Sequence, residues 1–150
     1  MNEKNKFMRL ALKEANKALL MGEVPIGAVI VKDGVVLARA YNKRNTKKSA
    51  TAHAEILAIE KACKKLGDWR LDGTEMYVTL EPCPMCAGAI ANARVEKLYF
   101  GAYEKKSGAI LSNYQILFSS GLNHTAQVEG GILHDECSCL LKNFFKSKRK

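Results

Sequence analysis

The chain has 150 residues, of which 24 are Lys or Arg and 15 are Asp or Glu, so its formal net charge is +9. This length predicts a single domain over residues 1–150 that buries enough surface to fold without disulfides. Its 47% hydrophobic and 26% charged residues exclude a disordered or collagen-like chain, and no apolar run reaches the roughly 20 residues of a membrane span.

Helical and strand-like spacings alternate along the chain. The expected elements are a helix over residues 4–20, strands over 26–31 and 35–40, a helix over 52–66, a strand over 76–80, a helix over 84–93, a strand over 97–101 and a last helix after Gly130. The pair Asp33-Gly34 predicts a hairpin between the first two strands, and Gly67 ends the second helix. Pro84 suits a first helical turn, where its missing N–H costs nothing. This order predicts an α/β sandwich whose sheet begins as an antiparallel hairpin.

The charge and the cysteines indicate the partners and the compartment. Excess positive charge favours an anionic partner, usually nucleic acid, although a lysine-rich proteome would produce the same balance. The loop over residues 41–49 carries four basic residues and no acidic one: Lys43, Arg44, Lys47 and Lys48. Five cysteines without a signal-peptide core predict a cytoplasmic chain with reduced thiols, used for metal binding or catalysis rather than cross-links. Cys63, Cys137 and Cys139 are expected to be plain thiols.

Two short motifs contain the residues suited to catalysis. His53-Ala54-Glu55 lies at the start of the second predicted helix, and Pro82-Cys83-Pro84-Met85-Cys86 lies where a strand passes into the third helix. A Cys-x-x-Cys pair in a first helical turn places both sulfurs on one side, and the helix N-terminus favours their thiolates. One imidazole and two thiolates fit Zn²⁺, and three protein ligands leave a fourth position for water, as in catalytic zinc sites.

Glu55 is expected to reach the same site without being a ligand, and a carboxylate there can move protons between water and a leaving group. Each motif alone has plainer interpretations. A helix-start histidine is usually a cap or a surface residue, and a Cys-x-x-Cys pair can be a redox pair or half of a structural zinc site. Cys137-Ser138-Cys139 lacks the spacing for the other half. Together the two motifs form the signature of zinc-dependent base deaminases.

Four segments closely resemble the bacterial tRNA-specific adenosine deaminases, within the zinc-dependent cytidine and deoxycytidylate deaminase superfamily. They are residues 22–29 (GEVPIGAV), 51–56 (TAHAEI), 77–89 (YVTLEPCPMCAGA) and Asn123-His124, and the likeness extends over about residues 6–146. The resemblance implies a three-layer αβα sandwich of the cytidine-deaminase type, with a mixed sheet of about five strands. It also implies hydrolysis of the wobble adenosine of an arginine tRNA to inosine, by a homodimer with one Zn²⁺ per subunit.

The resemblance assigns roles residue by residue. It makes His53, Cys83 and Cys86 the zinc ligands, Glu55 the catalytic residue, and Asn42, Ala54 and Asn123 substrate-binding residues. The candidate contacts to RNA are Arg44, Lys105, Lys106, Phe145, Lys148 and Arg149. A buried amide suits Asn42 because it donates and accepts hydrogen bonds, and the alternative is a turn residue. Helical spacing alone favours core packing for Phe144 and Phe145. Lys148 and Arg149 would contact phosphates, or would form a solvated helix end.

Two stretches depart from the family pattern. Residues 111–114 read Leu-Ser-Asn-Tyr where the family often reads Gly-Ser-Leu-Met, so only Ser112 is kept. Thr125 stands where the family has an arginine after Asn123-His124. Both stretches are expected to face RNA or the partner subunit, so they bear on substrate identity rather than on the chemistry.

Three classes of function follow from these observations. The leading prediction is a zinc-dependent adenosine deaminase whose partner is the tRNA anticodon stem-loop. The alternative in the same superfamily is a free-base or nucleotide deaminase acting on guanine or cytosine, but the basic tail from Lys146 onward favours RNA. A non-catalytic RNA-binding or structural-zinc module is disfavoured by Glu55, since a structural site has no use for a carboxylate that is not a ligand.

Overall fold

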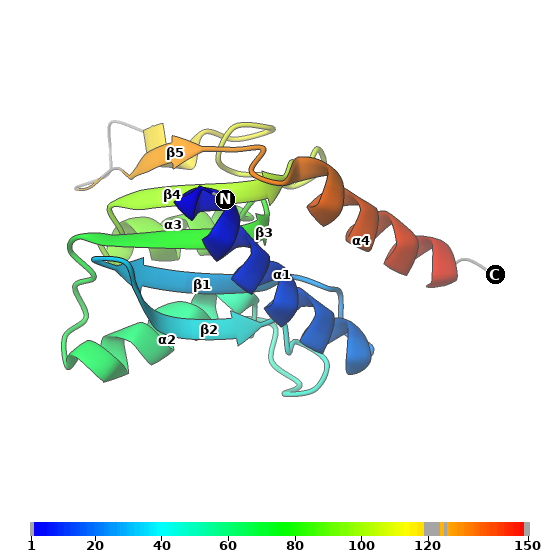
Figure 1. Cartoon of the computed structure of the whole chain (residues 1–150), viewed down its shortest axis with the longest axis horizontal. Helices are drawn as coiled ribbons and strands as arrows, with labels where there is room; N and C mark the ends of the chain where they lie inside the picture. The colour runs from blue at the N-terminus through cyan, green and yellow to red at the C-terminus, as the bar shows by residue number, and fades with distance from the viewer. Residues whose placement is uncertain (1, 119–123, 125, 149–150) are drawn as a thin grey trace.

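A mixed sheet forms the middle layer of the structure (Figure 1). The computed structural model describes residues 2–118, 124 and 126–148, and within them five strands lie in the order β2-β1-β3-β4-β5. Their bounds are β1 Gly27–Lys32, β2 Val35–Tyr41, β3 Thr74–Leu80, β4 Lys97–Ala102 and β5 Gln127–Glu129. β1 is antiparallel to β2 and β3, whereas β3, β4 and β5 are parallel.

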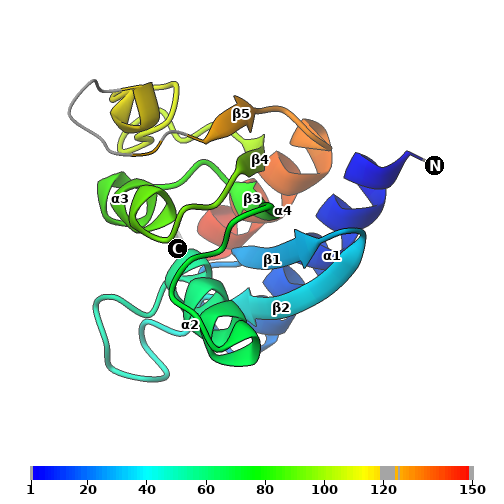
Figure 2. The ribbon, with the colours of Figure 1, turned by 90° about the vertical axis from the view of Figure 1, so that its left-hand side faces the viewer.

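Helices cover both faces of this sheet. The described helices are α1 Glu3–Leu20, α2 Ala54–Leu66, α3 Pro84–Asn92, α4 His134–Lys148 and a short 3-10 helix, η1 Ile116–Phe118. α1 and α4 pack on one face, and α2 and α3 on the other (Figure 2). The three-layer αβα sandwich and its five-stranded mixed sheet are thus confirmed. None of these described helices is long and apolar enough to cross a membrane.

Local sequence signals set most of the boundaries. Asp33 and Gly34, between β1 and β2, have φ angles of 51° and 77°, which is the left-handed backbone of a two-residue hairpin turn. Gly67 ends α2 with a φ of 70°, and Pro84 occupies the first turn of α3. These predictions are confirmed. β5 was not predicted from the sequence, because its three residues are too few to show the period of a strand.

Candidate active site

The N-termini of α2 and α3 bring His53, Cys83 and Cys86 together. His53 directly precedes α2 and Cys83 directly precedes α3, and neither side chain hydrogen-bonds to its own helix as a cap. The Nδ1 atom of His53 lies 3.7 Å from the Sγ atom of Cys83 and 3.6 Å from the Sγ atom of Cys86. All three ligand atoms lie within 4.8 Å of one another. The structure therefore excludes the helix-cap interpretation of His53 and joins the two motifs in one cluster.

The spacing of this cluster fits a tetrahedral metal ion. A zinc ion bonded to a sulfur at roughly 2.3 Å and to a nitrogen at about 2.0 Å, with a tetrahedral angle between the two bonds, holds these two ligand atoms about 3.6 Å apart. The observed separations between the His53 nitrogen and the two sulfurs are 3.6 and 3.7 Å. One imidazole and two thiolates are also a donor set that suits zinc. The three residues could thus hold a metal ion with one coordination position left over.

The electrostatics of the cluster favour bound cations. The first N–H groups of α2 and α3 lack helical partners and place partial positive charge beside the sulfurs, which stabilises thiolates. The contacts with Cys86 and with His53 hold the pKa of Cys83 well below its ordinary value, although burial opposes this. The contact with Cys83 raises the pKa of His53, and the contact with Cys83 together with burial raises the pKa of Cys86. These contacts therefore favour the thiolate form of Cys83, and a cation bound there would favour that of Cys86 as well.

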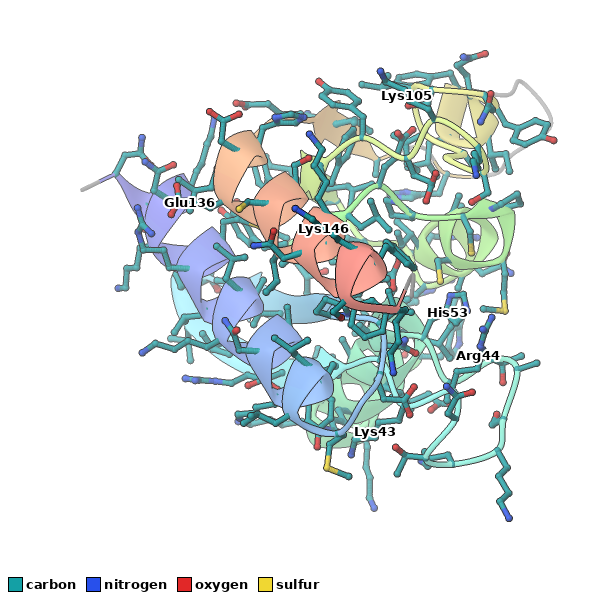
Figure 3. All side chains as sticks on the ribbon, turned by 90° about the vertical axis from the view of Figure 1, so that its right-hand side faces the viewer. Lys43, Arg44, His53, Lys105, Glu136 and Lys146 are labelled. Atoms are coloured by element: carbon teal, nitrogen blue, oxygen red, sulfur yellow. The ribbon has the colours of Figure 1, made fainter. Side chains whose placement is uncertain are left out.

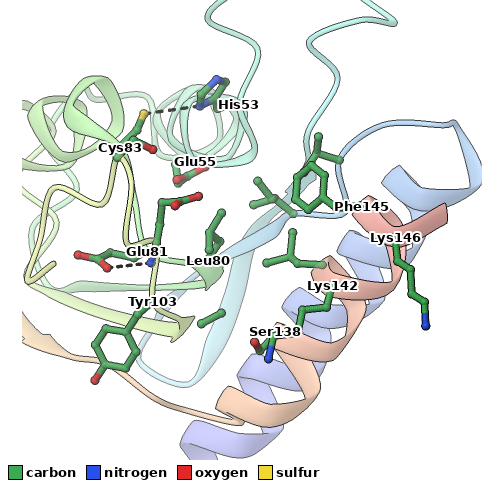
Figure 4. A pocket seen from close by; sticks show the side chains of 16 residues that line it. His53, Glu55, Leu80, Glu81, Cys83, Tyr103, Ser138, Lys142, Phe145 and Lys146 are labelled. Atoms are coloured by element: carbon green, nitrogen blue, oxygen red, sulfur yellow. Dashed lines mark hydrogen bonds between the residues drawn. The ribbon is translucent and has the colours of Figure 1, made fainter. Parts of the chain in front are cut away.

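Glu55 lies beside this cluster without belonging to it. Its side chain is only 4% exposed, and it does not belong to the group of three whose ligand atoms lie close together. Figure 4 shows its carboxylate near His53 and Cys83, in the same cavity. Burial raises the pKa of Glu55 to about 7, and the neighbouring Cys83 adds to the shift. A carboxyl group with such a pKa can both accept and donate a proton near neutral pH.

A cavity of about 710 Å³ extends from the cluster to α4 (Figure 4). Its lining includes His53, Glu55 and Cys83 at one end, Tyr103, Glu104 and Ser107 from the loop after β4, and Ser138, Leu141, Lys142, Phe145 and Lys146 from α4. The volume lies in the ordinary range for sites that bind small molecules. His53, Cys83 and Glu55 therefore open into a space large enough for a nucleoside.

Exposed basic side chains surround this face of the molecule. Figure 3 shows Arg44, Lys105 and Lys146 on three separate segments around His53. The basic RNA-contact candidates that the structure describes are all exposed: Arg44, Lys105, Lys106 and Lys148. Arg149 lies outside the described residues. Positive charge on several sides of one cavity suits a polyanion such as RNA.

The two phenylalanines of α4 have different surroundings. Phe144 is 8% exposed and packs in the interior, whereas Phe145 is 45% exposed and lines the cavity. The prediction of core packing is therefore confirmed for Phe144 and wrong for Phe145. Consecutive residues of a helix are about 100° apart around its axis, so only one of them can point into the core.

The predicted substrate-binding residues that the structure describes lie near the cavity but do not line it. Asn42 is buried; its Nδ2 atom donates to the carbonyl of Val24 at 3.3 Å, and its Oδ1 atom accepts from the backbone N–H of Arg44 at 3.1 Å. Asn42 thus forms a turn after β2, as the alternative prediction has it. Ala54 is buried at the start of α2. Asn123 lies outside the described residues. Their substrate-binding roles stay predictions.

Several residues that complete the cavity were not predicted from the sequence to line it. Those from α4 are spaced three and four residues apart: Ser138, Leu141, Lys142 and Lys146. This spacing predicts a common helical face, so a signal was present, but nothing showed that the face would lie over the cavity. Glu81 also lines the cavity and is 2% exposed. It stands within a motif of the resemblance, where it received no role.

Comparisons with known proteins identify relatives of the chain. A family model described as MafB19-like deaminase matches residues 2–149. The tRNA-specific adenosine deaminase of Bacillus subtilis is 50% identical over 150 residues, which cover 100% of this chain and 93% of the relative. A solved structure from a study of A-to-I editing by tRNA:A34 deaminases at the wobble position is 46% identical, with a TM-score of 0.88, and the match covers 91% of this chain and 99% of that chain.

A more distant neighbour bears on the alternative function. The guanine deaminase from Nitrosomonas europaea is 25% identical, with a TM-score of 0.78, and the match covers 93% of this chain and 83% of that chain. Both its identity and its structural similarity are lower than those of the tRNA:A34 deaminase structure. The comparisons therefore favour the tRNA deaminases over the free-base deaminases.

Proposed function

This chain belongs to the family of tRNA-specific adenosine deaminases, and we propose that its cavity deaminates the wobble adenosine of a tRNA anticodon to inosine. One observation carries the proposal: the buried carboxylate of Glu55 lies in the same cavity as His53 and Cys83, two of the three side chains that fit a metal ion, but outside their group. A hydrolytic deaminase needs these two parts, a group that activates water and a separate group that moves protons.

His53, Cys83 and Cys86 would hold one zinc ion per chain. Their donor set and their separations of 3.6 and 3.7 Å support zinc in particular. Zinc bound there would supply the Lewis acidity that makes water a nucleophile at neutral pH.

Glu55 would carry both protons of the reaction. As the water oxygen adds to C6 of adenine, the Glu55 carboxylate accepts one proton of the water and passes it to ring N1. Glu55 then accepts the second proton of the water, from the oxygen now bound to C6, and transfers it to the exocyclic amino group, which leaves as ammonia. Adenosine and water become inosine and ammonia, and Glu55 returns to its starting state. Burial keeps the carboxyl group beside the reacting atoms and away from bulk water, which supports this role.

The whole chain, residues 1–150, would act as one cytoplasmic deaminase domain that binds the anticodon stem-loop. Arg44, Lys105 and Lys106 are exposed and could contact phosphates. A homodimer would cover apolar residues that are exposed in this chain between β4 and β5: Leu111, Tyr114 and Phe118 are 40%, 53% and 54% exposed. Analytical ultracentrifugation should then give a mass of two chains.

An ammonia-release assay tests the proposed function. The purified, zinc-loaded protein is incubated separately with an arginine tRNA anticodon stem-loop that has adenosine at the wobble position, with free adenosine, with guanine and with cytosine. We expect ammonia from the stem-loop only, and inosine at the wobble position of the product. Turnover of guanine or cytosine without turnover of the stem-loop would instead support the free-base alternative.

A further inference from the structure

Glu81 is a buried carboxylate that holds a distant loop. Its Oε2 atom accepts hydrogen bonds from three consecutive backbone N–H groups, those of Ile110 at 3.2 Å, Leu111 at 2.7 Å and Ser112 at 2.8 Å. Its Oε1 atom accepts from the backbone N–H of Glu104 at 3.1 Å and from the hydroxyl of Ser112. The side chain is 2% exposed. Both ends of the segment over residues 103–112 are therefore attached to one carboxylate.

The main chain around Glu81 is attached to the same segment. The backbone N–H of Glu81 donates to the carbonyl of Ala102 at 2.9 Å, and the N–H of Ala109 donates to the carbonyl of Pro82 at 2.8 Å. Gly108 lies directly against the carboxylate, because a Cβ atom there would be 2.6 Å from the Glu81 carboxyl carbon. The segment thus folds around Glu81 with no space for a further atom.

This segment forms one wall of the candidate active site. Tyr103, Glu104 and Ser107 line the cavity, and a dashed line in Figure 4 marks the hydrogen bond from the backbone N–H of Glu104 to the Glu81 carboxylate. Lys105 and Lys106 are exposed on the same segment. The position of Glu81 therefore decides where a group of cavity-lining and basic side chains stands.

We propose that Glu81 is a positioning residue, whose carboxylate holds residues 103–112 in the place where they contact the RNA substrate. This inference rests on the proposed function. A carboxylate suits the role because each of its oxygens only accepts hydrogen bonds, and here five donors converge on them. Hydrogen bonds to a charged group are also stronger than neutral ones, so the segment is held firmly.

Glu81→Gln is the most informative variant. Glutamine replaces one of the two accepting oxygens by an NH₂ group, which only donates. This NH₂ group must then face either the N–H of Glu104 or the three N–H groups of residues 110–112, and those hydrogen bonds are lost. We expect the KM for the anticodon stem-loop to rise about tenfold, with kcat within about threefold of wild type, because a displaced wall weakens binding. Zinc content should stay at wild-type level. Amide hydrogen exchange should accelerate at residues 104 and 110–112 and stay unchanged at residues 44–46.

Glu14→Gln is the matched control, since Glu14 is also a buried carboxylate, 3% exposed, but lies outside the cavity and, among the residues that the structure describes, hydrogen-bonds only to Lys17 of its own helix. We expect the KM of Glu14→Gln to equal that of wild type.

Gly108→Ala tests the same wall without changing Glu81, because the Cβ atom of the alanine would displace the segment from the carboxylate. It should raise KM as Glu81→Gln does, and it serves as the test if Glu81→Gln does not fold.

The outcomes separate this inference from the proposed function. If wild-type protein does not deaminate the stem-loop, the proposed function fails. If wild type is active and both Glu81→Gln and Gly108→Ala keep its KM, the positioning role of Glu81 is wrong. A merely structural role would lower the amount of active enzyme, and hence the apparent kcat, and would leave KM unchanged. That result would also overturn the inference.

Discussion

The buried carboxylate of Glu23 accepts two hydrogen bonds from Thr46. The backbone N–H of Thr46 donates at 2.6 Å and its hydroxyl donates at 2.7 Å. The backbone N–H of Asn45 adds a third at 3.2 Å. Glu23 is 1% exposed and stands just before Val24, which lines the cavity. The carboxylate of Glu23 thus attaches the basic loop that carries Arg44 to the site.

This attachment predicts a pH-dependent stability. Burial raises the pKa of Glu23, but the hydrogen bonds from Thr46 and Asn45 and the charge of Arg44 outweigh it, so the pKa lies below its ordinary value. A carboxyl group with a lower pKa in the folded state stabilises the fold above its unfolded pKa of about 4.3, and this contribution is lost as pH falls through the folded pKa. We expect Glu23→Gln to lower the free energy of unfolding at pH 7 by about 1–3 kcal/mol.

Urea unfolding at several pH values checks this prediction. The difference between wild type and Glu23→Gln should shrink as the pH falls below about 4.3, because the wild-type carboxylate then becomes protonated. A difference that stays constant down to the lowest pH at which both proteins fold would contradict the prediction.

Glu55→Gln should separate proton transfer from metal binding. The amide occupies the same volume but cannot accept and return a proton, so kcat for the stem-loop should fall by about 10²–10⁴-fold. Zinc content, measured by atomic emission, should equal that of wild type because Glu55 lies outside the ligand group. Turnover within a few-fold of wild type would refute the proton-carrying role.

Cys86→Ala should remove metal and stability together. Cys86 is fully buried and its sulfur lies 3.6 Å from the His53 nitrogen, so its loss leaves two ligands and a small cavity. We expect dialysed protein to lose its zinc and to melt at a lower temperature than wild type. Cys139→Ala is the control, since Cys139 is exposed on α4 and should retain zinc and wild-type stability. Stoichiometric zinc in Cys86→Ala would show that the ligand assignment is wrong.

Gly27→Ala tests how closely α1 packs on the sheet. A Cβ atom at Gly27, the first residue of β1, would lie 2.1 Å from the carbonyl oxygen of Ala11 and 2.5 Å from the nitrogen of Ala15. Both are backbone atoms, so the helix itself must move, and we expect the free energy of unfolding to fall by about 3 kcal/mol or more.

Gly88→Ala should instead raise the free energy of unfolding by about 0.5–1 kcal/mol, because Gly88 lies inside α3 and a Cβ atom there would enter open space. Urea unfolding of both variants measures the two effects, and equal values would contradict the packing argument.

The cluster of His53, Cys83 and Cys86 was predictable from sequence because its parts are local motifs. His53 and Cys83 each stand directly before a helix, and the residues around them carry the start signals of those helices. The α/β sandwich followed from the alternation of helical and strand periods for the same reason, whereas its three-layer αβα form was implied by the family resemblance. Local periods and motifs thus determine most elements of this fold.

The wall of the cavity was not predictable in this way. Glu81 bonds to partners 23 to 31 residues further along the chain, and Glu23 bonds to Thr46 across 23 residues. No period or spacing links such positions, since these hydrogen bonds join segments that are far apart in the sequence. Phe145 was misassigned for a related reason: helical spacing shows that Phe144 and Phe145 differ in direction, but not that a cavity replaces the core beneath one of them.

The lysines of α4 that line the cavity should contribute to RNA affinity through their charge. Lys142 and Lys146 are four residues apart on one helical face and reach the cavity beside Phe145. Each phosphate contact releases counterions, so loss of one or two contacts should flatten the slope of log Kd against log salt by roughly 0.7–1.8. We expect the double variant Lys142→Gln/Lys146→Gln to bind the stem-loop more weakly at low salt and to approach wild type at high salt. Lys64→Gln, exposed at the far end of α2 from His53, should keep the wild-type slope. Binding measured by fluorescence anisotropy over a salt series decides this, and an unchanged slope in the double variant would mean that neither lysine contacts a phosphate.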